Sequence, residues 1–320
     1  MFLLSRSLLS AKERTTGGQM LRKNTKARFI MRKHTFIPSA LVALAAFSSC
    51  SKESIPVEPE IIEPVVEESI PFVLNAEAVD TKALFGDDWR LSWEKNDYIF
   101  AVTTDQEWSS YTIFTYNGTA FTTTKTISNG THTFNFIYAP FAQRDYHTAT
   151  GTKFSISEIQ GMSTSNPKAG LKNYYPLAGQ ATLTTPTASL DAKLNHLATI
   201  VKVTVKNMTG AAIKVNSLRM DMPAVGIAGL FKVDFEGTPS LKRIPGTINL
   251  TSVTNLISGG VTLEVGEEIP VYFVIAPVDR YNGDIIFTAE TSTKKYVKSK
   301  PVVNVTFRAG TYNSATYVLE

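Results

Sequence analysis

Cys50 is the only cysteine among the 320 residues, so any thiol chemistry in this chain belongs to that position. A single cysteine cannot form an internal disulfide, and it lacks the second cysteine of a CxxC metal or redox site. A buried structural thiol is the usual alternative for a lone cysteine. The surrounding stretch "AAFSSCSKES", residues 45–54, argues against burial, because it joins an apolar run to an acidic, proline-rich one.

The residues before Cys50 have the three-part layout of a secretory signal. Residues 31–49 begin with Arg32 and Lys33, continue through an apolar stretch, and end in small residues. The apolar stretch is shorter than the about 20 residues that a membrane-spanning helix needs. Followed by cysteine, this segment resembles a bacterial lipoprotein signal, in which the cysteine is acylated after the signal is removed. The resemblance implies lipidation of Cys50 and attachment to the outer membrane.

Removal of the signal reverses the net charge of the chain. The signal is complete without residues 1–30, so we expect translation to start at Met31. Residues 1–50 hold nine of the 32 Lys and Arg residues and one of the 28 acidic residues. The remainder has 23 basic and 27 acidic residues, a net charge of −4. The basic balance of the whole sequence therefore gives no support to a nucleic-acid partner.

An acidic segment follows the cysteine. Residues 51–69 carry six glutamates, one lysine and three prolines. Repulsion between the charges and the stiffness of proline keep such a segment extended. We expect residues 50–69 to tether a folded body to the lipid on Cys50.

Residues 70–320 are dominated by alternation of period two, which is typical of β-strands. In residues 131–140 and 200–207, apolar side chains share one face, and polar side chains share the other in the second stretch. Frequent Asn-Gly and Gly turn signals separate short strands, which favours antiparallel sandwiches. A single sandwich of 250 residues would be large, and the strand pattern is interrupted near residue 190. The sequence therefore predicts an all-β fold with one sandwich in residues 70–190 and a second in residues 191–320.

The search for catalytic chemistry finds no complete motif. After the signal the only histidines are His132, His147 and His196. No two of them are spaced as two metal ligands on one helix would be. His196 precedes a buried-looking strand and is interpreted as a structural histidine. The HExxH, GxSxG and phosphate-loop patterns are absent. We expect no enzyme activity, no metal and no cofactor.

Tryptophans offer a second, non-catalytic interpretation. Trp89 and Trp108, with Trp93 between them, could form a platform on which sugars stack, although tryptophans in β-rich domains more often pack a core. The alternative function is therefore a monomeric surface lipoprotein that binds glycans or host ligands through Trp89 and Trp108.

Four stretches resemble the fimbrillin-like proteins of Bacteroidetes. They are "VDTKALFGDDWRLSWEKNDYIFAV" (79–102), "LNHLATIVKVTVKN" (194–207), "VYFVIAP" (271–277) and "FRAGTYNSATYVL" (307–319). In the first stretch the matching positions are Thr81, Lys82, Phe85, Trp93, Asp97 and Ile99.

The resemblance implies a subunit of a type V pilus with two tandem transthyretin-like β-sandwich domains. Such pilins are exported as lipoproteins, and a trypsin-like protease removes the N-terminal segment with the first strand. A strand from another subunit then fills the groove. The implied partners are other pilus subunits, by β-strand addition, and the outer membrane through Cys50. Host proteins or glycans are further candidates.

The residues suggest positions for these steps. Ile70, Phe72 and Leu74 alternate on one face and would form the removed strand. Cleavage would fall between Lys82 and Ala83, or less favourably at Arg90. Lys82 departs from the arginine cleaved in the best-known systems, so an uncut chain that stays as a pilus anchor is the alternative. Near the C-terminus, a possible donor strand alternates Ala315, Tyr317 and Leu319, and an ordinary last strand of its own domain explains the same pattern.

Overall fold

The fold was analysed in a computed structural model. The structure describes residues 70–78, 93–105, 111–138, 147–148, 151–168, 170–184 and 189–320, all within one compact unit, residues 63–320. Almost all regular elements are strands, which confirms the predicted all-β class. Across these described ranges, no helix is long and apolar enough to span a membrane.

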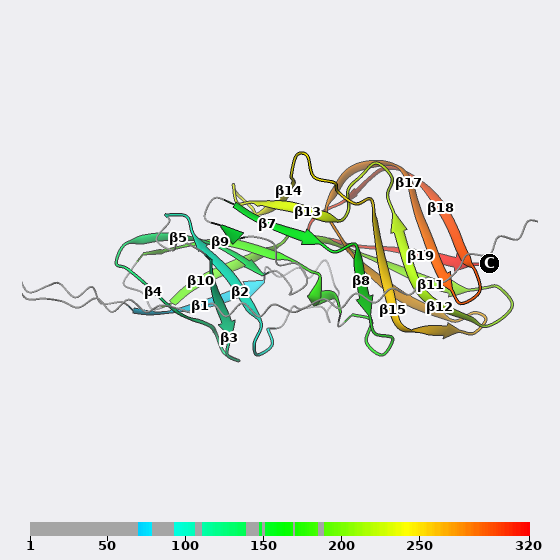
Figure 1. The fold of residues 1–320 in the computed structure, drawn as a ribbon, viewed down its shortest axis with the longest axis horizontal. Helices are drawn as coiled ribbons and strands as arrows, with labels where there is room; N and C mark the ends of the chain where they lie inside the picture. Colours follow the sequence, from blue (N-terminus) through cyan, green and yellow to red (C-terminus); the bar gives the residue numbers. More distant parts are fainter. Residues whose placement is uncertain are drawn as a thin grey trace, which may run out of the picture. The chain divides into compact units, whose positions relative to one another are not determined.

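The first half of the chain forms a closed barrel (Figure 1). Its strands are β1 (Ile70–Ala78), β2 (Tyr98–Thr103), β3 (Thr112–Tyr116), β4 (Phe121–Ile127), β5 (Thr131–Tyr138), β9 (Leu177–Thr184) and β10 (Ser189–His196). They follow the order β1-β10-β9-β5-β2-β3-β4 around the barrel. Alternation fills the interior: Phe134 and Phe136 on β5 are fully buried, as are Ile99 on β2 and Phe114 on β3. Alternating side chains of a closed sheet fill the inside of a barrel in this way.

This barrel corrects the prediction that the first domain is a sandwich of two separate sheets. The closure depends on β1, which pairs with β4 on one side and with β10 on the other. The pairing with β10 is parallel and joins segments more than 100 residues apart, Asn75 with Asp191 for example. Parallel pairing between distant segments leaves no turn signal in the sequence, which is why the alternation predicted sheets without predicting their closure.

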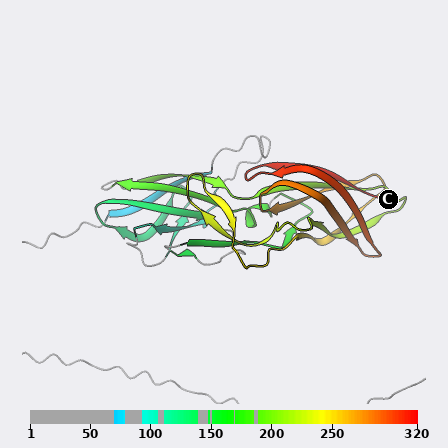
Figure 2. The same cartoon turned by 90° about the horizontal axis from the view of Figure 1, so that it is seen from above.

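The second half contains two sheets that face each other (Figure 1, Figure 2). The three-stranded sheet has the order β16-β11-β19, with β11 (Thr199–Asn207), β16 (Glu268–Ile275) and β19 (Tyr312–Leu319). The five-stranded sheet has the order β18-β17-β12-β15-β8, with β8 (Ile159–Met162), β12 (Ile213–Asp221), β15 (Ser252–Leu263), β17 (Val278–Thr291) and β18 (Lys295–Phe307). The rings of Phe287 on β17 and Tyr317 on β19 lie 5.9 Å apart between the two sheets.

A further sheet combines strands from the two halves of the sequence. The order of this four-stranded sheet is β14-β13-β7-β6, with β6 (His147–Thr148), β7 (Gly151–Ile156), β13 (Gly229–Asp234) and β14 (Ser240–Arg243). A 3-10 turn, η2 (Leu171–Asn173), precedes β9. Both β7 and β8 precede residue 190, yet they pair with β13 and β15. The predicted division between residues 190 and 191 falls within β10, a barrel strand.

Buried amides hold β8 and β15 against the edge of β16. Gln160, 1% exposed, donates from Nε2 to the Val274 carbonyl over 2.7 Å, and its Oε1 accepts from the Val274 N–H over 2.9 Å. Asn255 donates from Nδ2 to the carbonyl of Tyr272. These bonds satisfy main-chain groups of β16 that no neighbouring strand pairs, as buried polar groups require.

Replacement of Gln160 by methionine should therefore destabilise the fold. The change keeps the side-chain volume but leaves the buried N–H and C=O of Val274 without partners, so we expect a loss of about 2–4 kcal/mol in the free energy of unfolding. Chemical denaturation measures this loss. The matched control is Gln180→Met, because Gln180 is exposed and its side chain donates to the Asn135 side chain rather than to a buried main-chain group; it should change stability by less than about 0.5 kcal/mol. Equal effects at both sites would contradict the role given to Gln160.

Candidate functional site: the first strand of the barrel

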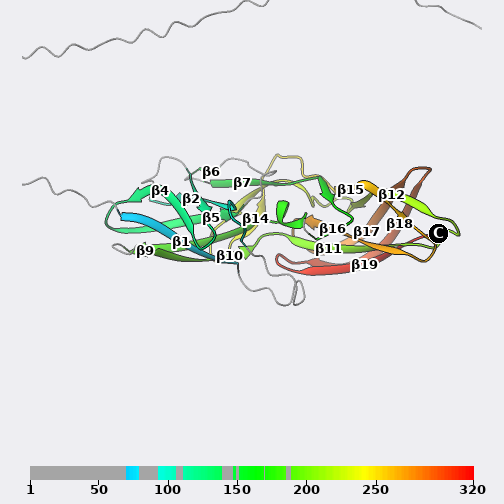
Figure 3. The ribbon, with the colours of Figure 1, turned by 90° about the horizontal axis from the view of Figure 1, so that it is seen from below.

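The strand β1 closes the barrel through two different kinds of pairing. Residues Val73 to Ala78 pair in parallel with β10, whereas residues Ile70 to Leu74 pair antiparallel with β4, with a register shift between Pro71 and Val73. In Figure 3 the blue β1 lies alongside β10. The remaining barrel strands pair antiparallel with their neighbours. Without β1, the other six strands would still form one continuous sheet, with β4 and β10 as its open edges.

The inner face of β1 is apolar. Leu74 is fully buried, and Ala76 is half-buried and packs against the same core. Burial of a leucine side chain stabilises a fold by about 1.5–3 kcal/mol. Residues 70–78 are a strand, as their alternation predicted. Of the three side chains assigned to its inner face, Leu74 is confirmed, whereas those of Ile70 and Phe72 lie outside the described residues.

Trp93 closes the end of β1 that extends beyond β4. The last β1–β4 pair is Leu74 with Phe121, and two residues further on the Ala76 carbonyl accepts a hydrogen bond from the Trp93 indole Nε1–H over 2.8 Å. The indole ring meets Phe121 and Tyr138 edge to face, with centroids 5.0 and 5.2 Å apart. Trp93 thus packs in the core and bonds to β1, which favours the core interpretation for this tryptophan. Burial raises the pKa of the neighbouring Tyr138, and Asp97 adds to the shift.

A tight turn fixes the position of Trp93. The Glu94 N–H donates to Oδ2 of Asp97, and the Asp97 N–H donates back to the Glu94 carbonyl, both over 2.8 Å. Asn96 takes the left-handed conformation that the turn requires, with φ 76°. Lys172 on η2 forms an ion pair with Glu94 over 2.5 Å. The acidic residues after Trp93 therefore support the turn.

The outer face of β1 is polar. Asn75 donates from Nδ2 to Oδ1 of Asp191 on β10 over 2.9 Å, and Glu77 lies opposite Lys193 in the register. An open hollow adjoins this strand. Its lining combines apolar groups such as Leu74, Trp93 and Phe121 with polar groups such as Gln180 and Asp191. The strand is accordingly held by its main chain and by alternate side chains, the two elements of strand-addition recognition.

Several predicted site residues lie outside the described residues. They are Cys50, Lys82, Ala83, Trp89, Arg90 and Trp108. Along the sequence, Lys82 follows the end of β1 at Ala78 and precedes β2. A cut after Lys82 would therefore break the only covalent connection between β1 and the rest of the barrel.

The last strand is packed in its own sheet. β19 pairs in parallel with β11 from Tyr312 to Leu319. Tyr317 and Leu319 are buried, Ala315 is half-buried, and burial raises the pKa of Tyr317 to about 12. The structure thus shows the second of the two predicted arrangements, the ordinary last strand. A role as donor stays a prediction, and it would require β19 to leave β11.

The histidines have structural surroundings. His132 places Nδ1 2.5 Å from Oδ2 of Asp105 and Nε2 3.1 Å from the Ser128 carbonyl. His196 is buried and packs against the Tyr175 ring. The side chain of His147 is not among those described. Within the described ranges, no three His, Cys, Asp or Glu residues are grouped as a metal site would require.

Comparison with known proteins gives structural matches alone. No protein-family model matches the chain, and no curated protein matches its sequence. A proposed cell adhesion protein from Bacteroides ovatus is similar with a TM-score of 0.51 and 13% identity, over 79% of this chain and 92% of the other. The chain has the fold of that protein. A second similar structure is a proposed cell adhesion protein from Bacteroides uniformis, with a TM-score of 0.45 and 12% identity over 78% of this chain and 93% of the other. A third is a fimbrial protein from Bacteroides ovatus, with a TM-score of 0.34 and 14% identity over 79% of this chain and 51% of the other. The fold shared with the first of these structures agrees with the resemblance to fimbrillin-like proteins of Bacteroidetes.

Shortening the buried side chain of β1 should destabilise the barrel. Leu74→Ala removes apolar atoms from a fully buried site, and such changes lower the free energy of unfolding by about 2–5 kcal/mol. The neighbouring Asn75→Ala alters an exposed side chain and should lower it by less than about 1 kcal/mol. Urea denaturation compares the two variants. Similar losses would show that the inner face of β1 does not carry the packing described above.

Proposed function

We propose that this chain is a structural and adhesive subunit of a cell-surface type V pilus, polymerised by replacement of β1 with a strand of another subunit. The observation that carries the proposal is the position of β1: it is the first described strand, and it closes a barrel between two other strands. Its removal leaves the remaining strands in one sheet. The fold shared with a proposed cell adhesion protein supports the same conclusion.

The energetics favour a replacement strand over an open barrel. Loss of β1 would expose the main-chain edges of β4 and β10, and it would remove the apolar cover that Leu74 gives to the core. Unpaired strand edges and exposed apolar surface both promote association with another chain. A replacement strand must run parallel to β10 and antiparallel to β4, and must present an apolar side chain at the position of Leu74.

The export route belongs to the same proposal. The signal in residues 31–49 directs the chain to the cell surface, the lipid on Cys50 holds it to the outer membrane, and residues 50–69 form the tether. A cut after Lys82 then separates the lipid and β1 from the subunit. Host proteins or glycans are the proposed targets of adhesion.

Removal of β1 should create a site for a strand. A chain that begins at Ala83 should form oligomeric ladders that resist mild detergent, whereas a chain that begins at Ser51 should not. A synthetic peptide of residues 69–79 should bind the shorter chain and suppress the ladders, because it restores the pairing of β1. Calorimetry and detergent gels measure both effects.

The control peptide for this experiment carries Leu74→Asp. A charged group at a buried apolar position should weaken binding by about tenfold or more. Equal binding of the two peptides, or a shorter chain that stays monomeric, would refute strand replacement at this site.

The N-terminus of the protein on cells tests the processing step. N-terminal sequencing of sheared surface protein should find a chain that starts at Ala83, because a cut after Lys82 releases β1. If all the surface protein instead retains an acylated Cys50, the chain is not cut, and the uncut anchor or the solitary surface lipoprotein is the better description.

A further inference from the structure

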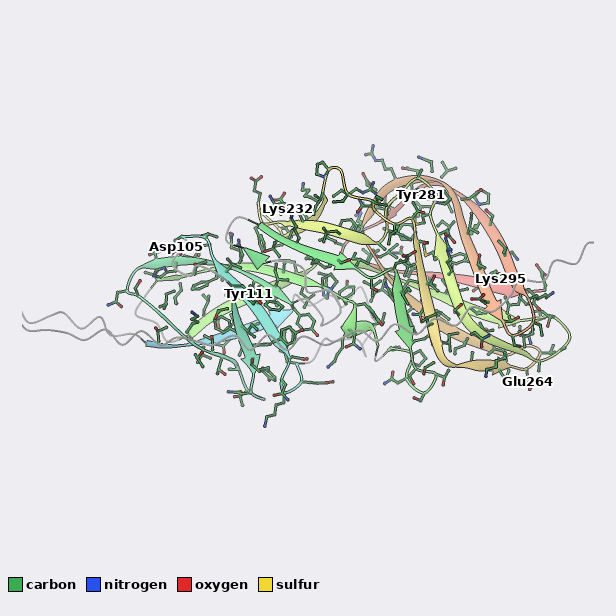
Figure 4. All side chains as sticks on the ribbon, in the orientation of Figure 1. Asp105, Tyr111, Lys232, Glu264, Tyr281 and Lys295 are labelled. Atoms are coloured by element: carbon green, nitrogen blue, oxygen red, sulfur yellow. The ribbon has the colours of Figure 1, made fainter. Side chains whose placement is uncertain are left out.

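Most strand edges outside the barrel are blocked against a further strand. The main chain of β16 bonds to Gln160 and Asn255, and its Pro270 has no N–H to offer. In the five-stranded sheet, β8 is one of the two edge strands, and its Gly161 N–H donates to the Tyr174 hydroxyl. The edge strands β14 and β18 carry exposed basic residues, and β18 also contains an exposed proline: Lys242, Arg243, Lys295, Lys298, Lys300 and Pro301, of which Figure 4 labels Lys295. Proline, lysine and short length are the usual protections of an edge.

β19 lacks every one of these protections. It is the edge strand of its sheet and has eight residues. The sequence from Tyr312 to Leu319 contains no charged residue and no proline. In Figure 3 this red strand borders its half of the molecule. A long, neutral edge of this kind is a template for pairing with another strand.

The main-chain groups that face outward can be identified from the pairing with β11. The carbonyls of Thr311 and Leu319 accept hydrogen bonds from Ile200 and Met208, so the odd-numbered residues face β11. Main-chain groups alternate in direction along a strand, and those of Ser314, Thr316 and Val318 therefore point away from the sheet. Within the described part of the chain, no strand pairs with this side of β19.

We propose that the free edge of β19 pairs antiparallel with β19 of a second copy of this chain, about a two-fold axis at Thr316. Thr316 then lies opposite the partner's Thr316, and Ser314 opposite the partner's Val318. The three pairs would exchange about six main-chain hydrogen bonds and join two three-stranded sheets into one.

The side chains favour a copy of the same strand as the occupant. Ser314 and Thr316 are exposed, Val318 is half-buried, and a threonine pair across an antiparallel ladder is favourable. The nearest charged residue along the strand is Glu320, which falls opposite Tyr312 in this register and so meets no like charge. Because β19 is neutral, two copies can approach without repulsion, which the lysines of β18 would prevent in a pairing of that strand.

The contact is independent of the proposed replacement of β1. The contact does not involve β1, and it requires that β19 stay paired with β11. It joins two subunits side by side, whereas strand replacement would join them through the barrel. Failure of either can therefore be recognised without reference to the other.

Site-specific cross-linking tests the register. The full chain carries Cys50→Ser, so that an introduced cysteine is the only thiol, and is treated in mild detergent with a short bismaleimide. Thr316→Cys should yield a covalent dimer, because the two α-carbons lie about 5.5 Å apart in the proposed pair. The matched control is Val318→Cys on the same edge, whose α-carbons would lie roughly 14 Å apart and should not react. Cross-linking of both variants or of neither overturns the proposal.

Sedimentation equilibrium tests the edge without a new thiol. Thr316→Lys sets two lysines opposite each other at the axis, and it should raise the dissociation constant of the dimer at least about tenfold. Thr204→Lys adds the same charge to β11 at the position paired with Thr316, one strand inside the edge, and should leave the dimer intact. Circular dichroism verifies that each variant is folded. A chain that is monomeric at every concentration, or a dimer unaffected by Thr316→Lys, overturns the proposal.

Discussion

The main-chain groups on the edges of a strand need hydrogen-bond partners, and β1 meets this need for two strands at once. It covers the edge of β4 with an antiparallel pairing and the edge of β10 with a parallel one. The barrel has no open edge for that reason. Its core depends on the closure as well, because Leu74 and the Trp93 indole are both held where β1 meets the sheet.

The second half of the chain meets the same need with side chains in place of a strand. Gln160 and Asn255 reach from β8 and β15 to the edge of β16 and bond to its peptide groups. Both amides are buried, and their hydrogen bonds to β16 fix the spacing and register of the two sheets as well as cover an edge. This arrangement also brings β8, which precedes the last two barrel strands in the sequence, into the C-terminal sheets.

Local patterns in the sequence were sufficient to predict where strands lie. They were not sufficient to predict which strands pair with each other. The alternation around Phe134 and Phe136 predicted β5 and its buried face correctly, because side-chain direction along a strand depends on adjacent residues alone. The parallel pairing of Asn75 with Asp191 depends on residues 116 positions apart, and nothing near either residue encodes it. Gln160 was equally unpredictable, since a polar residue in a strand normally indicates exposure, and the partner that permits its burial is 114 positions away.

The first and last described strands, β1 and β19, share one topological property that is compatible with both proposed contacts between subunits. β1 pairs in parallel with β10, and β19 pairs in parallel with β11, the strand that follows β10 in the sequence. In each case the other strands of the sheet are joined to one another by their own ladders. A terminal strand can then leave, or accept a partner, without disturbing those ladders. The two strands differ on their second side. β1 is also paired with β4 and must be removed before its place can be taken, whereas among the described residues no strand lies beyond β19, which in the proposed contact would pair without leaving its sheet.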